Sequence, residues 1–195
     1  MSPLKSQDLT DMSQAIEIRI PDSTDMVKMH RIHVWENGAS LATVTFPPGW
    51  SRPIVGSYLC AEEFFIFEGE LRMSGETFLP NDHTWVPPQS LRVDTYSPQG
   101  AITMAWFYGK PVWVRQEKDE GEATQIKTHV DAHTNVDVRK NNADSVPGRT
   151  LMPPAGEFTS TQEFEVIDVV KRTWDLYAAG EKVTLSGQEL VRLSK

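Results

Sequence analysis

Residues 46–88 read FPPGWSRPIVGSYLCAEEFFIFEGELRMSGETFLPNDHTWVPP. Short runs of aromatic and aliphatic residues alternate here with turn residues, at positions 47–49 (PPG), 74–75 (SG) and 81–82 (ND). Many short strands separated by turns are typical of a β-sandwich or a β-barrel, whereas βαβ proteins place helical stretches between their strands. The stretch therefore predicts an all-β fold.

The flanking sequence continues this pattern on both sides. Strand-like segments precede it at 15–21 (AIEIRIP), 28–38 (KMHRIHVWENG) and 39–46 (ASLATVTF), and others follow at 91–100 and 101–109. The tripeptide Glu36-Asn37-Gly38 is a hairpin signal between two of them. We therefore expect residues 30–115 to form one β-sandwich or β-barrel, with residues 1–29 as an N-terminal arm and first strand.

Residues 116–195 have a different character. Their first part is polar and poor in large apolar residues, and we expect it to wrap the barrel as a surface segment. Ser160 and Glu163 have the spacing of a capping box, and Gly180 suits a helix end. Apolar residues recur at helical spacing between them, at Phe164, Ile167, Val170, Trp174 and Tyr177. This predicts a C-terminal helix in an extension that packs on the barrel, although the β-branched run at 166–170 favours a strand instead.

The composition limits the possible partners and compartments. The chain has 195 residues with 39% hydrophobic and 24% charged residues, as in globular proteins with a real core. Its net charge of −8 makes nucleic acid and anionic membranes unexpected partners, because both need clustered Lys and Arg. Cys60 is the one cysteine, so no intramolecular disulfide forms. We find no signal-peptide pattern and no apolar run of membrane-spanning length, and we expect a cytoplasmic protein.

Several residues of 46–88 have the spacing of a known family. Gly49, Glu62, Gly69 and Pro87 match the framework of the two cupin motifs, and residues 30–115 resemble the cupin superfamily on this ground. The resemblance implies a small jelly-roll β-barrel with a ligand pocket inside it, commonly in a homodimer. In most members, three histidines and a glutamate hold Fe, Mn, Ni or Zn. Of these four ligands, only Glu62 is present here.

The histidine positions of the motifs hold other residues. Counting from Gly49 places the first two at Val55 and Ser57, whereas counting back from Glu62 places them at Gly56 and Tyr58. The third position falls on Arg92.

One carboxylate is too few ligands for a transition metal, and a guanidinium, which stays protonated, repels a cation. We therefore expect no metal ligands and no cofactor. Fixed charges on Glu62 and Arg92 would take the place of the metal. A divalent Fe, Mn, Ni or Zn ion on other ligands is the alternative.

Four residues are the candidates for catalysis. Glu62 in an apolar barrel is balanced between burial, which favours the neutral acid, and Arg92, which favours the carboxylate. Such a group suits proton transfer, and Arg92 suits stabilisation of a developing anion. Tyr58 or His83 would add a hydrogen bond. The alternatives are a structural Glu62–Arg92 ion pair, an Arg92 on the barrel rim and a Tyr58 that only packs. Glu63 should point away from the pocket, into solvent.

The surrounding aromatic residues are expected mainly in the core. Some of them should line a pocket suited to an apolar or aromatic ligand. The candidates for substrate binding are Trp50, Phe64, Trp85, Tyr96, Trp106 and Tyr108.

Three functions stay open at this point. The first is metal-independent acid–base catalysis on a small, partly apolar organic molecule, of the isomerase, cyclase or lyase type. The second is a metal-dependent oxygenase or lyase with non-standard ligands, including His83. The third is a ligand-binding or sensing barrel without catalysis.

Overall fold

The computed structural model describes residues 3–117, 125–130, 136–139 and 149–193. All regular secondary structure in these ranges is β, which confirms the all-β prediction. No helix in them is long and apolar enough to cross a membrane. The chain divides into two compact units, Met12–His129 and a second unit that combines Met1–Asp11 with Val130–Lys195. We call them the barrel unit and the C-terminal unit.

The barrel unit contains one large antiparallel sheet and two smaller ones. The large sheet has the strand order β14-β10-β7-β12-β4-β3-β2. Its strands are β2 (Ile16–Arg19), β3 (Met26–Val34), β4 (Ser40–Phe46), β7 (Glu62–Gly69), β10 (Asp82–Val86), β12 (Ala101–Phe107) and β14 (Ile126–His129). A second sheet has the order β5-β11-β8-β9, and a strand pair joins β13 to β6. These strands are β5 (Trp50–Arg52), β6 (Gly56–Tyr58), β8 (Leu71–Met73), β9 (Glu76–Phe78), β11 (Thr95–Ser97) and β13 (Trp113–Arg115).

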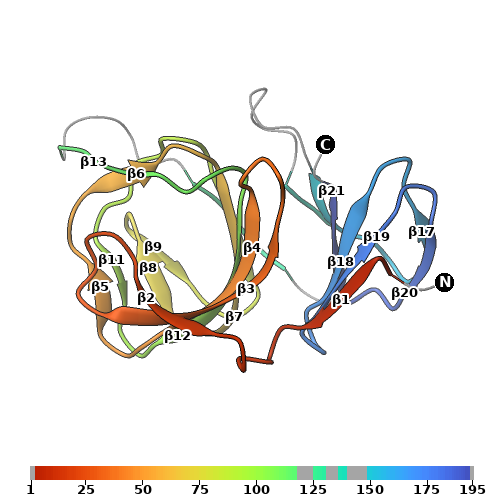
Figure 1. The fold of residues 1–195 in the computed structure, drawn as a ribbon, viewed down its shortest axis with the longest axis horizontal. Helices are drawn as coiled ribbons and strands as arrows, with labels where there is room; N and C mark the ends of the chain where they lie inside the picture. The colour runs from red at the N-terminus through yellow and green to blue at the C-terminus, as the bar shows by residue number, and fades with distance from the viewer. Residues whose placement is uncertain (1–2, 118–124, 131–135, 140–148, 194–195) are drawn as a thin grey trace. The chain divides into compact units, whose positions relative to one another are not determined.

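The sheets of the barrel unit surround a single interior (Figure 1). Side chains from both main sheets form one apolar cluster there. Its buried members are Val27, Ala42, Val44, Trp50, Phe64, Ile66, Leu71, Met73, Phe78, Val86 and Ala105. Burial of this apolar area is the main stabilising contribution to the barrel.

Strand β7 shows how the sequence positions the interior. Glu62, Phe64 and Ile66 alternate with residues of the opposite face, since successive side chains of a strand point to opposite sides. Both faces are buried from Glu62 to Phe67. At the end of the strand, Gly69 has φ 76°, and a side chain on it would overlap the carbonyl oxygen of Gly100. A glycine is required at this turn.

The C-terminal unit has a six-stranded sheet of order β1-β19-β18-β21-β16-β15 and a strand pair, β17-β20. Its strands are β1 (Lys5–Asp8), β15 (Val136–Arg139), β16 (Arg149–Met152), β17 (Gly156–Thr159), β18 (Phe164–Asp168), β19 (Thr173–Tyr177), β20 (Lys182–Leu185) and β21 (Glu189–Leu193). Glu165 and Arg192 lie opposite each other on β18 and β21 and form a buried ion pair. Trp174 donates its ring N–H to the Glu165 carboxylate over 2.8 Å.

The predicted C-terminal helix is wrong, and the strand alternative is correct. Strands β18 and β19 form an antiparallel hairpin. Its turn is fixed by the Asp168 carboxylate, which accepts hydrogen bonds from the backbone N–H groups of Val170 and Lys171. Val170, which the helical spacing places on the buried face, is 62% exposed at this turn. The β-branched residues therefore follow their strand preference, and the local Asp168 turn interrupts the helical period.

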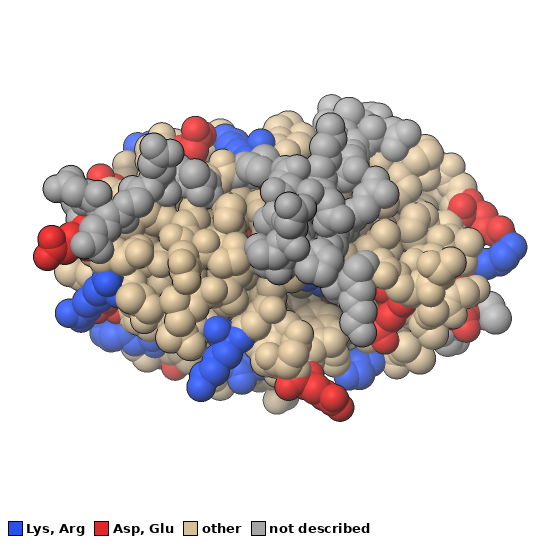
Figure 2. All heavy atoms as spheres, turned by 90° about the horizontal axis from the view of Figure 1, so that it is seen from above, with Lys and Arg blue, Asp and Glu red and all other residues tan. Residues whose placement is uncertain are grey.

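The barrel unit extends beyond residues 30 and 115. Strand β2 and the beginning of β3 precede residue 30, and β14 follows residue 115 as an edge strand beside β10. Residues 118–124, 131–135 and 140–148 of the polar segment lie outside the described residues. On the face drawn in Figure 2, the described Lys and Arg side chains are interspersed with Asp and Glu.

Candidate functional site

The interior of the barrel unit contains a cavity of about 200 Å³. Residues of both main sheets and of β6 line it. The lining residues are Ile18, Arg19, Ile20, Pro21, Met29, Arg31, Ser40, Ala42, Val44, Phe46, Trp50, Arg52, Tyr58, Glu62, Phe64, Leu71, Met73, Arg92, Thr95, Thr103, Ala105, Phe107 and Pro111. Most of them are apolar, and the few polar groups among them give the cavity its chemistry.

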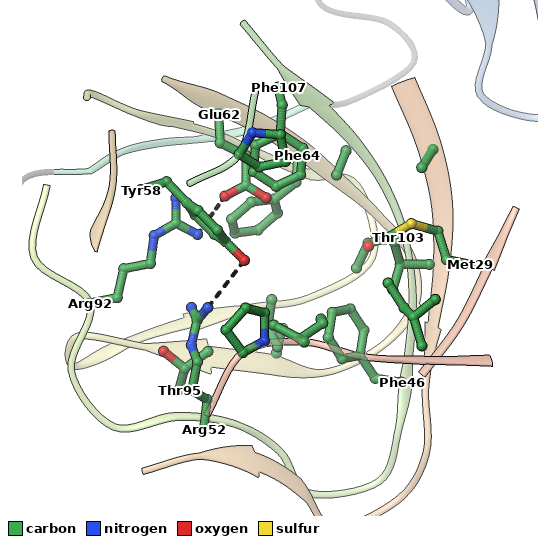
Figure 3. A pocket seen from close by; sticks show the side chains of 18 of the residues that line it. Met29, Phe46, Arg52, Tyr58, Glu62, Phe64, Arg92, Thr95, Thr103 and Phe107 are labelled. Atoms are coloured by element: carbon green, nitrogen blue, oxygen red, sulfur yellow. Dashed lines mark hydrogen bonds and ion pairs between the residues drawn. The ribbon is translucent and has the colours of Figure 1, made fainter. Parts of the chain in front are cut away.

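One end of the cavity is polar (Figure 3). Glu62 and Arg92 form an ion pair there, and both residues are buried. The contact joins Arg92 Nη1 to Glu62 Oε2, but this oxygen accepts no hydrogen bond of good geometry. The guanidinium of Arg92 also lies over the ring of Tyr58, with 4.7 Å between its central carbon and the ring centroid. The ion pair therefore keeps a carboxylate inside the barrel, beside the aromatic ring of Tyr58.

Arg52, at the end of β5, is a second guanidinium at this end of the cavity. It is 4% exposed, and its Nη1 donates to the Tyr58 hydroxyl over 3.3 Å. Its central carbon lies 3.8 Å from the centroid of the Trp113 ring. Burial lowers the pKa of Arg52 below its ordinary value, and the nearby charge of Arg92 also lowers it. Arg52 stays protonated at neutral pH, so it places a largely desolvated positive charge beside the Glu62–Arg92 pair.

The opposite end of the cavity is mostly apolar (Figure 3). Met29 and Phe46 lie there, together with Thr103. Phe64 and Phe107 flank Glu62. A ligand that fills the cavity must therefore combine a polar end with an apolar body.

The structure selects one of the two possible motif registers. Tyr58 and Glu62 line the cavity, whereas neither Val55 nor Ser57 does. Gly56 pairs through its backbone with Arg92, and a side chain on Gly56 would overlap Trp113 and the carbonyl oxygen of Val114.

The residues around the cavity do not fit a metal centre. Glu62 is the one carboxylate among the described lining residues, which include no histidine and no cysteine. Two guanidinium groups lie beside it, and they repel a cation. Across the described part of the chain, no three His, Cys, Asp or Glu residues are grouped closely enough to hold a metal ion.

His83 lies outside the cavity, contrary to the prediction. It is on β10, and its Nε2 lies 3.4 Å from an oxygen of Glu63. Tyr108 donates its hydroxyl to the other Glu63 oxygen over 2.7 Å. Glu63 is 0% exposed, so the expectation that it faces solvent is also wrong. The alternation along β7 puts Glu62 and Glu63 on opposite faces, and His83 belongs to the face of Glu63.

Some of the predicted substrate-binding residues line the cavity, and the others lie away from it. Trp50 and Phe64 line the cavity. Trp85 and Trp106 are buried elsewhere, and the Trp85 ring packs edge-on against Tyr108 at 5.3 Å between centroids. Tyr96 accepts a hydrogen bond from Arg72 over 2.9 Å, away from the cavity.

Arg52 is the residue that the sequence analysis missed. It lies two residues after Trp50 on β5, so the two side chains share a face and both line the cavity. That period of two was the available signal. Position 52 belongs to no motif, which is why the resemblance gave no hint of it.

Comparison with known proteins gives matches in fold alone. The sequence matches no protein-family model and no curated protein. A Nostoc punctiforme protein named as a candidate dioxygenase superposes with a TM-score of 0.72 at 11% identity, over 96% of this chain and 80% of that one. The bacterial pirin YhhW from Escherichia coli, in complex with nickel(II), gives a TM-score of 0.59 at 9% identity, over 97% of this chain and 96% of that one.

A cupin 2 conserved barrel domain protein from Leptotrichia buccalis is similar over nearly its whole length. Its TM-score is 0.54 at 11% identity, and the match covers 100% of this chain and 98% of that one. At such low identities the likeness is one of fold, and it agrees with the framework of Gly49, Glu62 and Gly69. The chain has the fold of the cupin superfamily.

Proposed function

We propose that the barrel unit binds a small, partly apolar organic molecule and transfers a proton on it with Glu62. The reaction would be of the isomerase, cyclase or lyase type. The observation that carries this proposal is the position of Glu62, the one described carboxylate that lines the cavity, beside the guanidinium groups of Arg92 and Arg52. A buried base next to fixed positive charges suits chemistry in which negative charge develops on the substrate.

The proton-transfer step needs only groups that line the cavity. Glu62 takes a proton from a carbon next to a carbonyl group. The electron pair of the broken C–H bond forms a C=C bond, and the π pair of the carbonyl group moves onto its oxygen. Arg92 and the Tyr58 hydroxyl are the donors near Glu62 that would stabilise this enolate oxygen. Return of the proton to a different carbon gives an isomer, and loss of a leaving group instead gives a lyase product. Proton transfer by a positioned group contributes about 10²- to 10⁴-fold in rate.

Hydrogen exchange tests this step before the natural substrate is known. Small carbonyl compounds, with and without a carboxylate group, are incubated with the protein in D₂O, and deuterium incorporation next to the carbonyl is followed by NMR. We expect the wild-type protein to catalyse exchange in part of this panel. The Glu62→Gln variant should lose at least about 100-fold of that rate.

The matched control is Glu76→Gln, the same change on an exposed carboxylate of β9. It should exchange like the wild-type protein. A folded Glu62→Gln variant that keeps the full rate would contradict the proposal. Binding without any exchange would instead favour the non-catalytic ligand-binding function.

A further inference from the structure

We infer that the molecule bound in the cavity is a small monocarboxylate, and that Arg52 holds its carboxylate group. This inference rests on the proposed function and names the class of its ligand. Three observations carry it: the charge of the cavity, the missing partners of Arg52, and the size and polarity of the space.

The cavity is positively charged inside an acidic protein. Four arginines line it, and Glu62 is the one described acidic residue that does. Arg52 and Arg92 are buried, whereas the other two, Arg19 and Arg31, are exposed. The whole chain has a net charge of −8, and on the face in Figure 2 charges of both signs are mixed. The described lining of the cavity therefore carries an excess of positive charge, and the low solvent exposure of Arg52 and Arg92 strengthens their effect on an anion.

Arg52 lacks the partner that a buried guanidinium needs. Among the described residues, Glu62 is in an ion pair with Arg92 and Asp22 with Arg115, and no carboxylate is in ion-pair range of Arg52. The Nε of Arg52 has no hydrogen-bond partner, and its bond to Tyr58 is long at 3.3 Å. Burial of an incompletely paired charge is costly, and an anionic ligand that pairs with Arg52 would offset this cost.

Two further groups without hydrogen-bond partners at the cavity are donors, whereas the one such acceptor among the described lining side chains, Glu62 Oε2, is in ion-pair contact with Arg92. Arg92 Nε and the ring N–H of Trp50 are buried without partners among the described residues. A lining rich in unused N–H donors fits a ligand that only accepts hydrogen bonds. An ionised carboxylate is such a ligand, because its two oxygens accept several bonds and donate none.

The guanidinium of Arg52 is held in place before a ligand binds. Its face lies on Trp113, and the ring N–H of Trp113 donates to the Asp22 carboxylate over 2.8 Å. Arg115 donates to the same carboxylate. Asp22 itself has φ 64°, in the left-handed region, which is uncommon for a residue other than glycine. Pre-organisation of this kind lowers the entropic cost of binding and favours the planar, two-point contact of an arginine with a carboxylate.

The volume limits the size of the ligand. An apolar protein cavity of about 150 Å³ holds benzene, which corresponds to about 25 Å³ per non-hydrogen atom. At this ratio the cavity of about 200 Å³ holds about eight non-hydrogen atoms. A carboxylate with an alkyl or aryl body of five or six carbons fills it, and the apolar end at Met29 and Phe46 receives that body. Inorganic phosphate would leave this end empty.

The test compares each acid with its neutral amide of the same shape. Hexanoate with hexanamide, and benzoate with benzamide, are titrated calorimetrically into the full-length wild-type protein. We expect each acid to bind about 10- to 100-fold more tightly than its amide, as for a hydrogen bond to a charged group. Arg52→Met should lose this preference by weakening the binding of the acids far more than that of the amides, and Arg52→Lys should keep part of it.

Arg72→Met is the control, because Arg72 is paired with Glu70 outside the cavity and its side chain is 44% exposed. It should bind both compounds like the wild-type protein. Equal affinity of acid and amide, no binding of either acid, or tighter binding of inorganic phosphate than of the acids would overturn the inference. The wild-type comparison decides the question even if Arg52→Met does not fold.

The two proposals fail in different ways. If Glu62→Gln abolishes exchange on neutral ketones while acids gain nothing over amides, the carboxylate inference fails and the proton transfer stands. If acids bind in preference to amides but Glu62→Gln leaves exchange unchanged, the assignment of Glu62 fails and the carboxylate site stands.

Discussion

Gly56 and Arg92 are hydrogen-bonded to each other through their backbones, and the Arg92 N–H donates to the Gly56 carbonyl oxygen over 2.8 Å. In the register that faces the cavity, both occupy positions that the family resemblance assigns to histidines. One position has no side chain, and the other carries a permanent positive charge. Tyr58 on β6 and Glu62 on β7 occupy the other two of the four positions that the resemblance assigns to metal ligands. The cavity thus combines a fixed ion pair and an aromatic hydroxyl at positions where the family resemblance implies metal ligands.

The space beside Gly56 is filled, and this gives a prediction for stability. A Gly56→Ala side chain would overlap Trp113 and the Val114 backbone, so we expect a loss of about 1–3 kcal/mol in the free energy of unfolding. Gly109→Ala is the control, because its added Cβ would meet Cys60 at an ordinary 3.5 Å. Urea denaturation measures both. Equal stability of the two variants would show that position 56 has room for a side chain.

The Glu62–Arg92 pair should matter for stability because it is buried. Arg92→Met leaves the Glu62 carboxylate without its partner, and we expect a loss of about 3–5 kcal/mol. Arg72→Met breaks an ion pair whose Arg72 side chain is half exposed, and it should cost less than about 1 kcal/mol. Urea denaturation of the two variants gives the comparison. A loss below about 1 kcal/mol for Arg92→Met would mean that the pair is not desolvated as the structure shows.

The Asp22 carboxylate gives a prediction for the pH dependence of stability. The hydrogen bond from Arg115 holds the pKa of Asp22 below its ordinary value of 3.8. A carboxyl group with a lowered pKa in the folded state stabilises that state above its unfolded pKa, and this contribution is lost as the pH falls through the folded pKa. The difference in unfolding free energy between wild type and Asp22→Asn should therefore be constant from about pH 5 to 7 and shrink below about pH 3.8.

Denaturant titrations at several pH values measure this difference. A gap between the two proteins that is the same at low and neutral pH would contradict the role of the Asp22 charge. Because Trp113 donates to Asp22 and supports Arg52, binding of hexanoate to Asp22→Asn should also be weaker than to the wild-type protein at pH 7.

The framework of the fold could be predicted from a few residues. Gly49, Glu62 and Gly69 lie at turns and on a strand, and their spacing matches the family motif. The same framework led to Glu62, Arg92 and Tyr58, which the structure brings together. Side chains outside it were harder to place. The turn before β10 contains Asn81 with φ 71°, so the face that His83 occupies does not follow from counting along the sequence.

The C-terminal unit shows a second limit. The residues from Phe164 to Tyr177 satisfy a helical and a strand period at once, and only the Asp168 turn and the long-range pairing of β18 with β21 decide between them. Arg52 shows a third limit, because a short strand between two turns carries too little pattern to reveal which charge it directs into the barrel.

Metal content tests the central claim, that fixed charges stand in this cavity in place of a metal centre. Protein purified without an affinity tag is analysed by elemental mass spectrometry, before and after dialysis against a chelator, together with the Glu62→Gln variant. We predict far less than one Fe, Mn, Ni or Zn per chain, and carboxylate binding that the chelator does not change. A near-stoichiometric metal that Glu62→Gln loses would contradict the account and make a metal-dependent oxygenase or lyase the better description.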